Sequence, residues 1–178
     1  MKFLIASDIH GSAYYTKEIL RVFASEKADK LILLGDIYNH GPRNVLPKDY
    51  APMQVADLLN EIKEKLIVIK GNCDSQVDTM ISQFDFLPSA LLISGDKSIF
   101  LTHGHQYNKD QKPKTNFDCV VYGHFHTGFI QKIDNTIYVN AGSVSLPKEQ
   151  TANSYLIIED GKIFLKDLQG KVIDSKSL

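Results

Sequence analysis

Short apolar runs, each followed closely by a residue able to bind a metal, constrain the fold of this chain more than any other feature. Five such runs cover residues 3–6, 31–34, 66–69, 99–101 and 119–121. The metal-competent residues that follow them are Asp8 and His10, Asp36, Asn72, His103, and His124 with His126. Short, continuous apolar runs are typical of strands buried on both faces. Ligands of open α/β sheets bind beyond the carboxyl ends of the strands, so these side chains are predicted to converge.

The wider pattern predicts an α/β (α+β) fold. Apolar residues recur at helical spacing over residues 13–27 and 53–65, and a short helix is favoured over residues 76–84. Strand candidates in the second half cover residues 90–93, 99–102, 119–122, 136–139, 155–158 and 163–165. The first half therefore alternates strand and helix, and the second half is mostly strand. We expect a single domain over residues 1–178, with two packed sheets and flanking helices.

Composition narrows the class of protein. A chain of 178 residues with 43% hydrophobic residues can bury a core within one domain. The formal net charge of -1 argues against a strongly basic nucleic-acid binder, but not against a small anionic substrate. No stretch approaches the roughly 20 apolar residues of a membrane helix, and the amino-terminal run is typical of a strand and not of a signal peptide. Cys73 and Cys119 lie far apart and form no Cys-x-x-Cys pair, which indicates a reduced, cytoplasmic protein.

The residue types indicate which metals they suit. Histidines mixed with carboxylates and an amide oxygen favour Mn, Fe, Zn or Ni over Ca or Mg. The seven candidate ligands are too many for one tetrahedral zinc ion, and they fit two metals that share a bridging carboxylate. All six histidines of the chain lie within or beside these turns. The sequence therefore predicts a metal centre.

The same motifs, in this order, resemble the signature of the calcineurin-like metallophosphoesterases. They are Asp8-x-His10, Gly35-Asp36, Gly71-Asn72-x-Asp74, Thr102-His103-Gly104-His105 and Gly123-His124-x-His126. Residues 39–44, 71–75 and 140–145 further resemble small bacterial phosphodiesterases of the YfcE type, and this resemblance covers nearly the full length. It implies a four-layer αββα sandwich, with two central mixed β-sheets flanked by helices.

The resemblance also implies an activity and a division of the ligands. Asp8, His10, Asp36 and His126 would hold one metal, and Asn72, His103 and His124 would hold the second, with Asp36 bridging the two. Manganese is the usual metal of such enzymes, with Fe, Zn or Ni as alternatives. The implied reaction is hydrolysis of a small phosphodiester by attack of a hydroxide that bridges the two metals.

The chain departs from the family pattern at Cys73, where many members have a histidine that assists the phosphate and the leaving group. A thiol with an ordinary pKa near 8.5 is a poor substitute for an imidazolium. We expect Asp74 to orient Asn72 or Cys73 from behind the metal ligands. His40 is the candidate for the missing acid. As alternatives, Cys73 can be a buried thiol without a chemical role, and His40 a donor that only stabilises its loop.

Residues 38–52 form a long irregular segment, and loops of this length are usually functional. Arg43 within it can present its planar guanidinium to a phosphate, or can instead serve as a surface ion-pair partner. Cys119 is expected in the core, and His105 is expected to hydrogen-bond near the rim of the site.

A turn after a later strand adds two more residues of interest. Asn140 and Ser143 are expected to fix this turn, and the backbone near Gly142 can also line the pocket.

Three rival functions stay open. A phosphomonoesterase would use the same ligands, and a non-catalytic metal-binding scaffold could share the fold. A nuclease on long DNA is disfavoured because no basic stripe is evident. The expected partner is a small phosphodiester, with no membrane and no long nucleic acid. Apolar strand edges near the carboxyl terminus would suit a homodimer, and a homotetramer is the alternative assembly.

Overall fold

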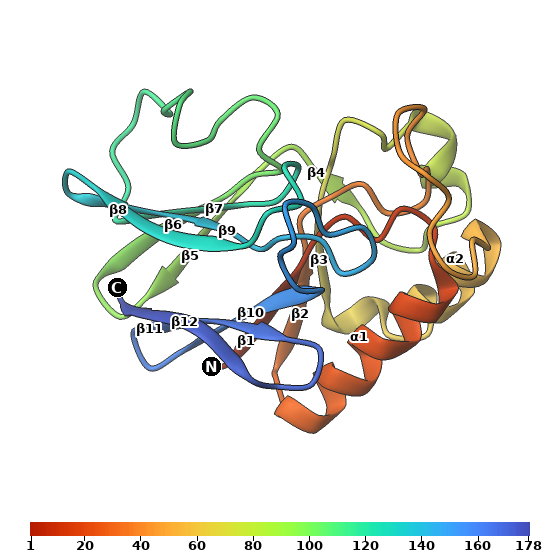
Figure 1. Ribbon diagram of the computed structural model, residues 1–178, viewed down its shortest axis with the longest axis horizontal. Coiled ribbons are helices and arrows are strands. Elements are labelled where there is room, and N and C mark those ends of the chain that lie inside the picture. The colour runs from red at the N-terminus through yellow and green to blue at the C-terminus, as the bar shows by residue number, and fades with distance from the viewer.

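Two mixed β-sheets form the centre of the computed structural model, which describes all 178 residues (Figure 1). The strands of the larger sheet are β1 (Phe3–Ala6), β2 (Lys30–Leu33), β3 (Leu66–Ile69), β4 (Phe86–Leu87), β10 (Ser154–Glu159), β11 (Lys162–Asp167) and β12 (Val172–Ser177). Those of the smaller sheet are β5 (Ala90–Ser94), β6 (Lys97–Leu101), β7 (Cys119–Tyr122), β8 (Phe129–Ile133) and β9 (Thr136–Asn140). The strand orders are β12-β11-β10-β1-β2-β3-β4 and β5-β6-β7-β9-β8. The predicted architecture of two packed mixed sheets is confirmed.

The parallel strands of each sheet are the ones that lead to the predicted ligands. β1, β2, β3 and β4 run parallel to one another, as do β6, β7 and β9. One core layer joins the two sheets and includes Ile5, Ile32 and Leu156 from the larger sheet and Leu101 and Val121 from the smaller. Because the sheets are packed through this layer, the carboxyl ends of strands from both sheets reach the same region.

Two α-helices cover the outer face of the larger sheet. α1 (Ala13–Glu26) begins where the Ser12 hydroxyl accepts a hydrogen bond from the Tyr15 N–H, and it buries an apolar stripe against the sheet. α2 (Pro52–Asn60) starts with proline in its first turn and ends five residues before the predicted residue 65, where a short 3-10 helix, Lys63–Lys65, follows. Residues Gln76–Met80 also form a 3-10 helix. Neither α-helix is long and apolar enough to cross a membrane.

A loop, rather than a helix, covers the outer face of the smaller sheet. The chain between β6 and β7, drawn in green, arches over this sheet (Figure 1). Phe117 from the loop stacks on Phe100 of β6, with ring centroids 4.8 Å apart. The buried Asn108 side chain holds the loop together, because it donates to the Gly104 carbonyl and accepts from the backbone of Asp110. Both α-helices therefore lie on one side of the sandwich, against the larger sheet.

Candidate metal centre

The carboxyl ends of five parallel strands bring together the seven metal-ligand candidates. β1 leads to Asp8 and His10, β2 to Asp36, β3 to Asn72, β6 to His103, and β7 to His124 and His126. The side chains contact one another across as many as 116 positions of sequence. The convergence predicted from the strand ends is therefore what the structure contains.

Asp8, His10 and His126 form the first group. The Nε2 atoms of His10 and His126 lie 3.1 Å apart, and the Asp8 Oδ1 atom lies 3.2 Å from the His126 Nε2 atom. Each ring is oriented by its other nitrogen. The Nδ1 atom of His10 lies 2.7 Å from the Asn39 carbonyl oxygen, and that of His126 lies 2.7 Å from the Leu146 carbonyl oxygen. A carbonyl only accepts, so both Nδ1 atoms carry a proton, and Nε2 is the atom of each ring that can offer a lone pair to a cation.

His103, Asn72 and His124 form the second group. His103 Nδ1 donates to the Leu34 carbonyl at 2.7 Å, so its Nε2 lone pair also points inward. That Nε2 atom lies 3.0 Å from Asn72 Oδ1 and 3.2 Å from His124 Nδ1. These three atoms are again gathered around one point, and each can offer a lone pair there.

Asp36 lies between the two groups. Its Oδ2 atom lies 3.7 Å from His10 Nε2, and its Oδ1 atom lies 3.5 Å from His103 Nε2. Each carboxylate oxygen therefore faces a different group. This is the position that a bridging ligand between two cations would occupy.

The inward-facing atoms fit a cation, because each is an oxygen or a ring nitrogen that can offer a lone pair. The buried Asp8 Oδ1 atom has no hydrogen-bond partner, although it faces two imidazoles. Without a metal, protons must separate the lone pairs. Burial opposes a charged His103 ring, but its contact with Asp36 and the negative charge of Asp8 raise the pKa of His103 to about 9. Burial and the neighbouring His103 charge lower the pKa of His124 to about 4.

Strained backbone accompanies the same residues. Asp8, His10, Asp36, His124 and His126 all have left-handed conformations, with φ between 52° and 66°. This region costs a residue with a side chain roughly 1–2 kcal/mol. Such strain concentrates at functional sites, where the surrounding structure holds it in place. The fold therefore accepts strain in order to turn five of the candidate ligands toward one place.

Asp74 ties two of the strand ends together. Its carboxylate accepts hydrogen bonds from the backbone N–H groups of Asp36, Ile37 and Gly71, at 2.7 to 2.9 Å. Burial raises the pKa of Asp74 to about 6, although these donors favour its charged form. Gly71 cannot be replaced without a clash, because a Cβ atom there would run into the Asp36 carboxylate. Asp74 therefore positions the loop after β3, including Asn72, against Asp36.

Cys73 and His40 lie in different surroundings. Cys73 lies beside the ligands, where its N–H donates to Asp36 Oδ1 at 2.8 Å. Burial and the Asp36 charge raise the pKa of the Cys73 thiol to about 12, so it stays protonated at neutral pH. His40 does not line the cleft above the site, and its ring packs edge-on against Tyr50. Its buried Nδ1 atom has no partner.

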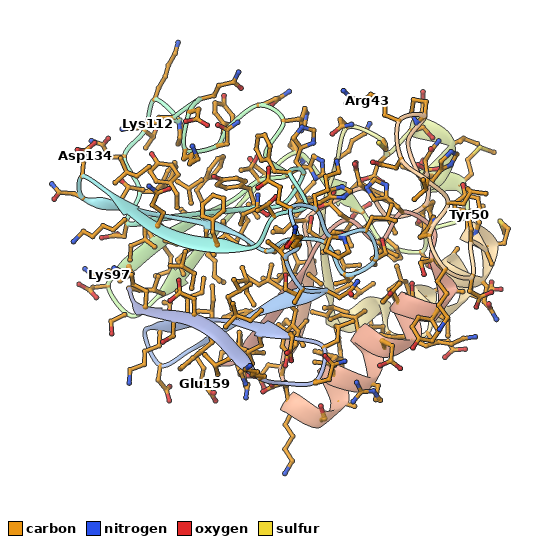
Figure 2. All side chains as sticks on the ribbon, viewed as in Figure 1. Arg43, Tyr50, Lys97, Lys112, Asp134 and Glu159 are labelled. Carbon is orange, nitrogen blue, oxygen red and sulfur yellow. The ribbon has the colours of Figure 1, made fainter.

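The ligands open into a cleft of about 700 Å³. Arg43, predicted to meet a phosphate, lines it from the loop before α2, which lies at the top of the view in Figure 2. Phe125 and Lys148 also line the cleft, and the sequence reasoning missed both. Phe125 lies between two predicted ligands in the sequence, and this position could have indicated that it lies beside the site. Lys148 follows the turn at residues 140–145, but its approach depends on long-range hydrogen bonds.

The remaining candidates are placed nearby or in the core. The His105 ring lies 5.4 Å from that of His103 and is exposed, so it stays outside the two groups. The Ser143 hydroxyl donates to the Asp8 carbonyl at 2.8 Å, and Asn140 donates to the Gly123 carbonyl at 2.7 Å. Both residues thus fix the turn after β9 to the ligand loops. Cys119 is fully buried between the sheets.

Comparison with known proteins gives the family. The model of the calcineurin-like phosphoesterase superfamily domain matches residues 1–161. Phosphodiesterase YfcE of Escherichia coli K12 is 43% identical over 162 residues, which cover 90% of this chain and 88% of that protein. The solved structure of YfcE, a phosphoesterase from E. coli, matches with a TM-score of 0.95 and 38% identity, over 99% of each chain. Vacuolar protein sorting 29 from Cryptosporidium parvum shares the fold, with a TM-score of 0.67 and 17% identity over 99% of this chain and 98% of that chain. This chain belongs to the calcineurin-like phosphoesterase superfamily.

Proposed function

We propose that this protein is a metal-dependent phosphodiesterase that hydrolyses a small phosphodiester at a site holding two divalent cations. The observation that carries the proposal is the position of Asp36, whose two carboxylate oxygens face two separate groups of imidazole nitrogens. Asp8, His10, His126 and Asp36 would hold one cation, and Asn72, His103, His124 and Asp36 the other. The mixed nitrogen and oxygen donors suit manganese, with Fe, Zn or Ni as alternatives.

The bound cations would supply a hydroxide at neutral pH and neutralise charge on the phosphate oxygens. The chain supplies orientation. Backbone carbonyls fix the tautomers of His10, His103 and His126, so that each ring offers Nε2 to the site. Asp74 holds the loop after β3 against Asp36. These contacts hold the candidate metal ligands in place, so that the ligands need no rearrangement when a substrate binds.

Two features favour a diester over a monoester. Cys73 keeps its proton and stays neutral, so it offers no positive charge to balance the second negative charge of a monoester. Two separate segments of the chain also line the cleft, one formed by residue 39 with residues 41–44 and one by residues 124–126 with Lys148. Each segment can accept one ester substituent. The similarity to a protein named a phosphodiesterase supports the same choice.

A paired assay tests the proposal. Manganese-loaded protein is expected to hydrolyse bis-p-nitrophenyl phosphate faster than p-nitrophenyl phosphate, and the metal content is expected to approach two ions per chain. Faster turnover of the monoester would replace the diesterase assignment with a monoesterase on the same site. Protein that neither contains nor binds a transition metal, and hydrolyses neither compound, would instead support the scaffold function.

A further inference from the structure

Two segments that line the cleft differ in chemistry. Residue 39 and residues 41–44 present polar groups, including Asn39, Arg43 and Asn44. The segment at residues 124–126 contains Phe125, the only phenylalanine, tyrosine or tryptophan among the 12 residues that line the cleft. An aromatic ring at this position meets whichever ester substituent lies on its side of the phosphate.

Phe125 is held in place but serves no core. Its N–H donates to the Gly123 carbonyl at 2.7 Å, and both neighbouring residues, His124 and His126, have constrained left-handed backbones. The ring packs edge-on against the His124 ring at 5.0 Å and against the Tyr122 ring at 6.2 Å. The residue nevertheless remains 44% exposed, and its ring belongs to none of the hydrophobic clusters. Folding thus leaves a positioned aromatic surface free beside a candidate ligand.

Lys148 adds a positive charge to the lining of the same cleft. Its backbone N–H donates to the His126 carbonyl at 3.0 Å, so its position is tied to the ligand loop. The ion pairs of lysine and arginine in this structure are made by other residues, which leaves the Lys148 ammonium free. An aromatic surface next to a free cation suits a group that is both planar and attached to an anion.

We infer that the cleft selects phosphodiesters carrying a planar aromatic ester group, which stacks on Phe125 while the phosphate lies over the metal-ligand candidates. The inference rests on the proposed function, because the phosphate must first be bound by that site. The ring of Phe125 contacts the ring of His124, so an aromatic group joined directly to the phosphate comes within its reach. Offset or edge-on aromatic contacts of this kind add affinity beyond the buried area.

Binding of two non-chromogenic diesters tests the inference. Calorimetry on the manganese-loaded protein would compare diphenyl phosphate with dimethyl phosphate, which share the phosphate and differ in aromatic character. The wild type is expected to bind diphenyl phosphate roughly tenfold more tightly, the size of one aromatic stacking contact. Phe125→Ala is expected to reduce this preference to about twofold, and Phe125→Tyr to retain it.

A matched control uses another exposed apolar side chain. Leu91 of β5 is 58% exposed and lies outside the cleft, so Leu91→Ala is expected to keep the wild-type preference. Equal affinity of the wild type for both diesters would overturn the inference. An undiminished preference in Phe125→Ala, with unchanged metal content, would overturn it as well.

The proposed function is judged separately by hydrolysis of methyl p-nitrophenyl phosphate. Absence of hydrolysis, together with an aromatic binding preference that depends on Phe125, would remove the diesterase assignment and leave the aromatic subsite standing. Hydrolysis without any aromatic preference would do the reverse.

Discussion

The floor and the rim of the cleft are built in opposite ways. The floor consists of the metal-ligand candidates Asp8, His10, Asp36, Asn72, His103, His124 and His126. Most of these side chains are buried, and backbone groups hold their orientation, with Asn72 the exposed exception. The rim consists of Arg43, Phe125 and Lys148, all exposed. The sheets thus preorganise the floor for chemistry, whereas the rim is free to select a substrate without cost to the fold.

Replacing Asp36 is the strongest way to break the floor. Asp36→Asn is expected to lower kcat/KM by about a thousandfold or more, because a bridging charge between two cations would be lost. The fold should survive, since an amide oxygen can still accept the hydrogen bond from the Cys73 N–H. Diesterase assays with circular dichroism and thermal melting check both parts. A folded Asp36→Asn protein that keeps the full rate of hydrolysis would contradict the two-metal proposal.

Removing the metal is expected to have the next largest effect on the floor. Chelation is expected to abolish hydrolysis and to lower the melting temperature by about 5–10 °C relative to protein with manganese at about a hundred times its dissociation constant. The physical reason is that inward lone pairs and the unpartnered Asp8 Oδ1 atom are left facing one another. Differential scanning calorimetry measures the shift.

The melting comparison has a control in the rim. Arg43→Ala should show the same manganese-dependent shift as the wild type, because Arg43 contacts none of the ligand groups. Identical melting of the wild type with and without manganese would argue against a metal site in the floor.

Cys73 lies at the boundary between floor and rim, and its replacement sharpens the comparison. Cys73→His is expected to raise kcat by about tenfold to a hundredfold for diesters with an alkyl leaving group, since an imidazolium can donate the proton that a thiol of pKa about 12 withholds. The gain should be small for p-nitrophenolate, which leaves without a proton. Rates for the two leaving groups, with Cys73→Ser as the control, measure the difference. Equal gains for both would point to phosphate binding in place of proton donation.

The floor was predictable from the sequence, and the reason is local. Asp8, Asp36 and His103 each follow an apolar run, so strand periodicity alone indicates where their side chains emerge. Several strands lack that signal. All six residues of β12 are exposed, β4 has only two residues, and β8 mixes glutamine and lysine with apolar positions. None of these three strands was predicted.

The rim was only partly predictable, because its positions depend on contacts distant in sequence. Lys148 reaches the cleft because Ser143 and Ser145 donate to the Asp8 carbonyl, more than 130 positions away. No local pattern encodes such a contact. Arg43 was predicted because it lies in a long irregular loop. Phe125 was not predicted, because the metal-ligand pattern selects only the two histidines that flank it.

The two rim cations should have the smallest effect. Arg43→Ala and Lys148→Ala are each expected to raise KM for a diester by about fivefold and to leave kcat nearly unchanged, because exposed cations attract ground state and transition state alike. The loss should shrink at high salt, where such charges are screened. Lys112→Ala is the matched control, since Lys112 pairs with Asp134 on another loop (Figure 2). A hundredfold fall in kcat in either rim variant would instead show that this cation stabilises the transition state.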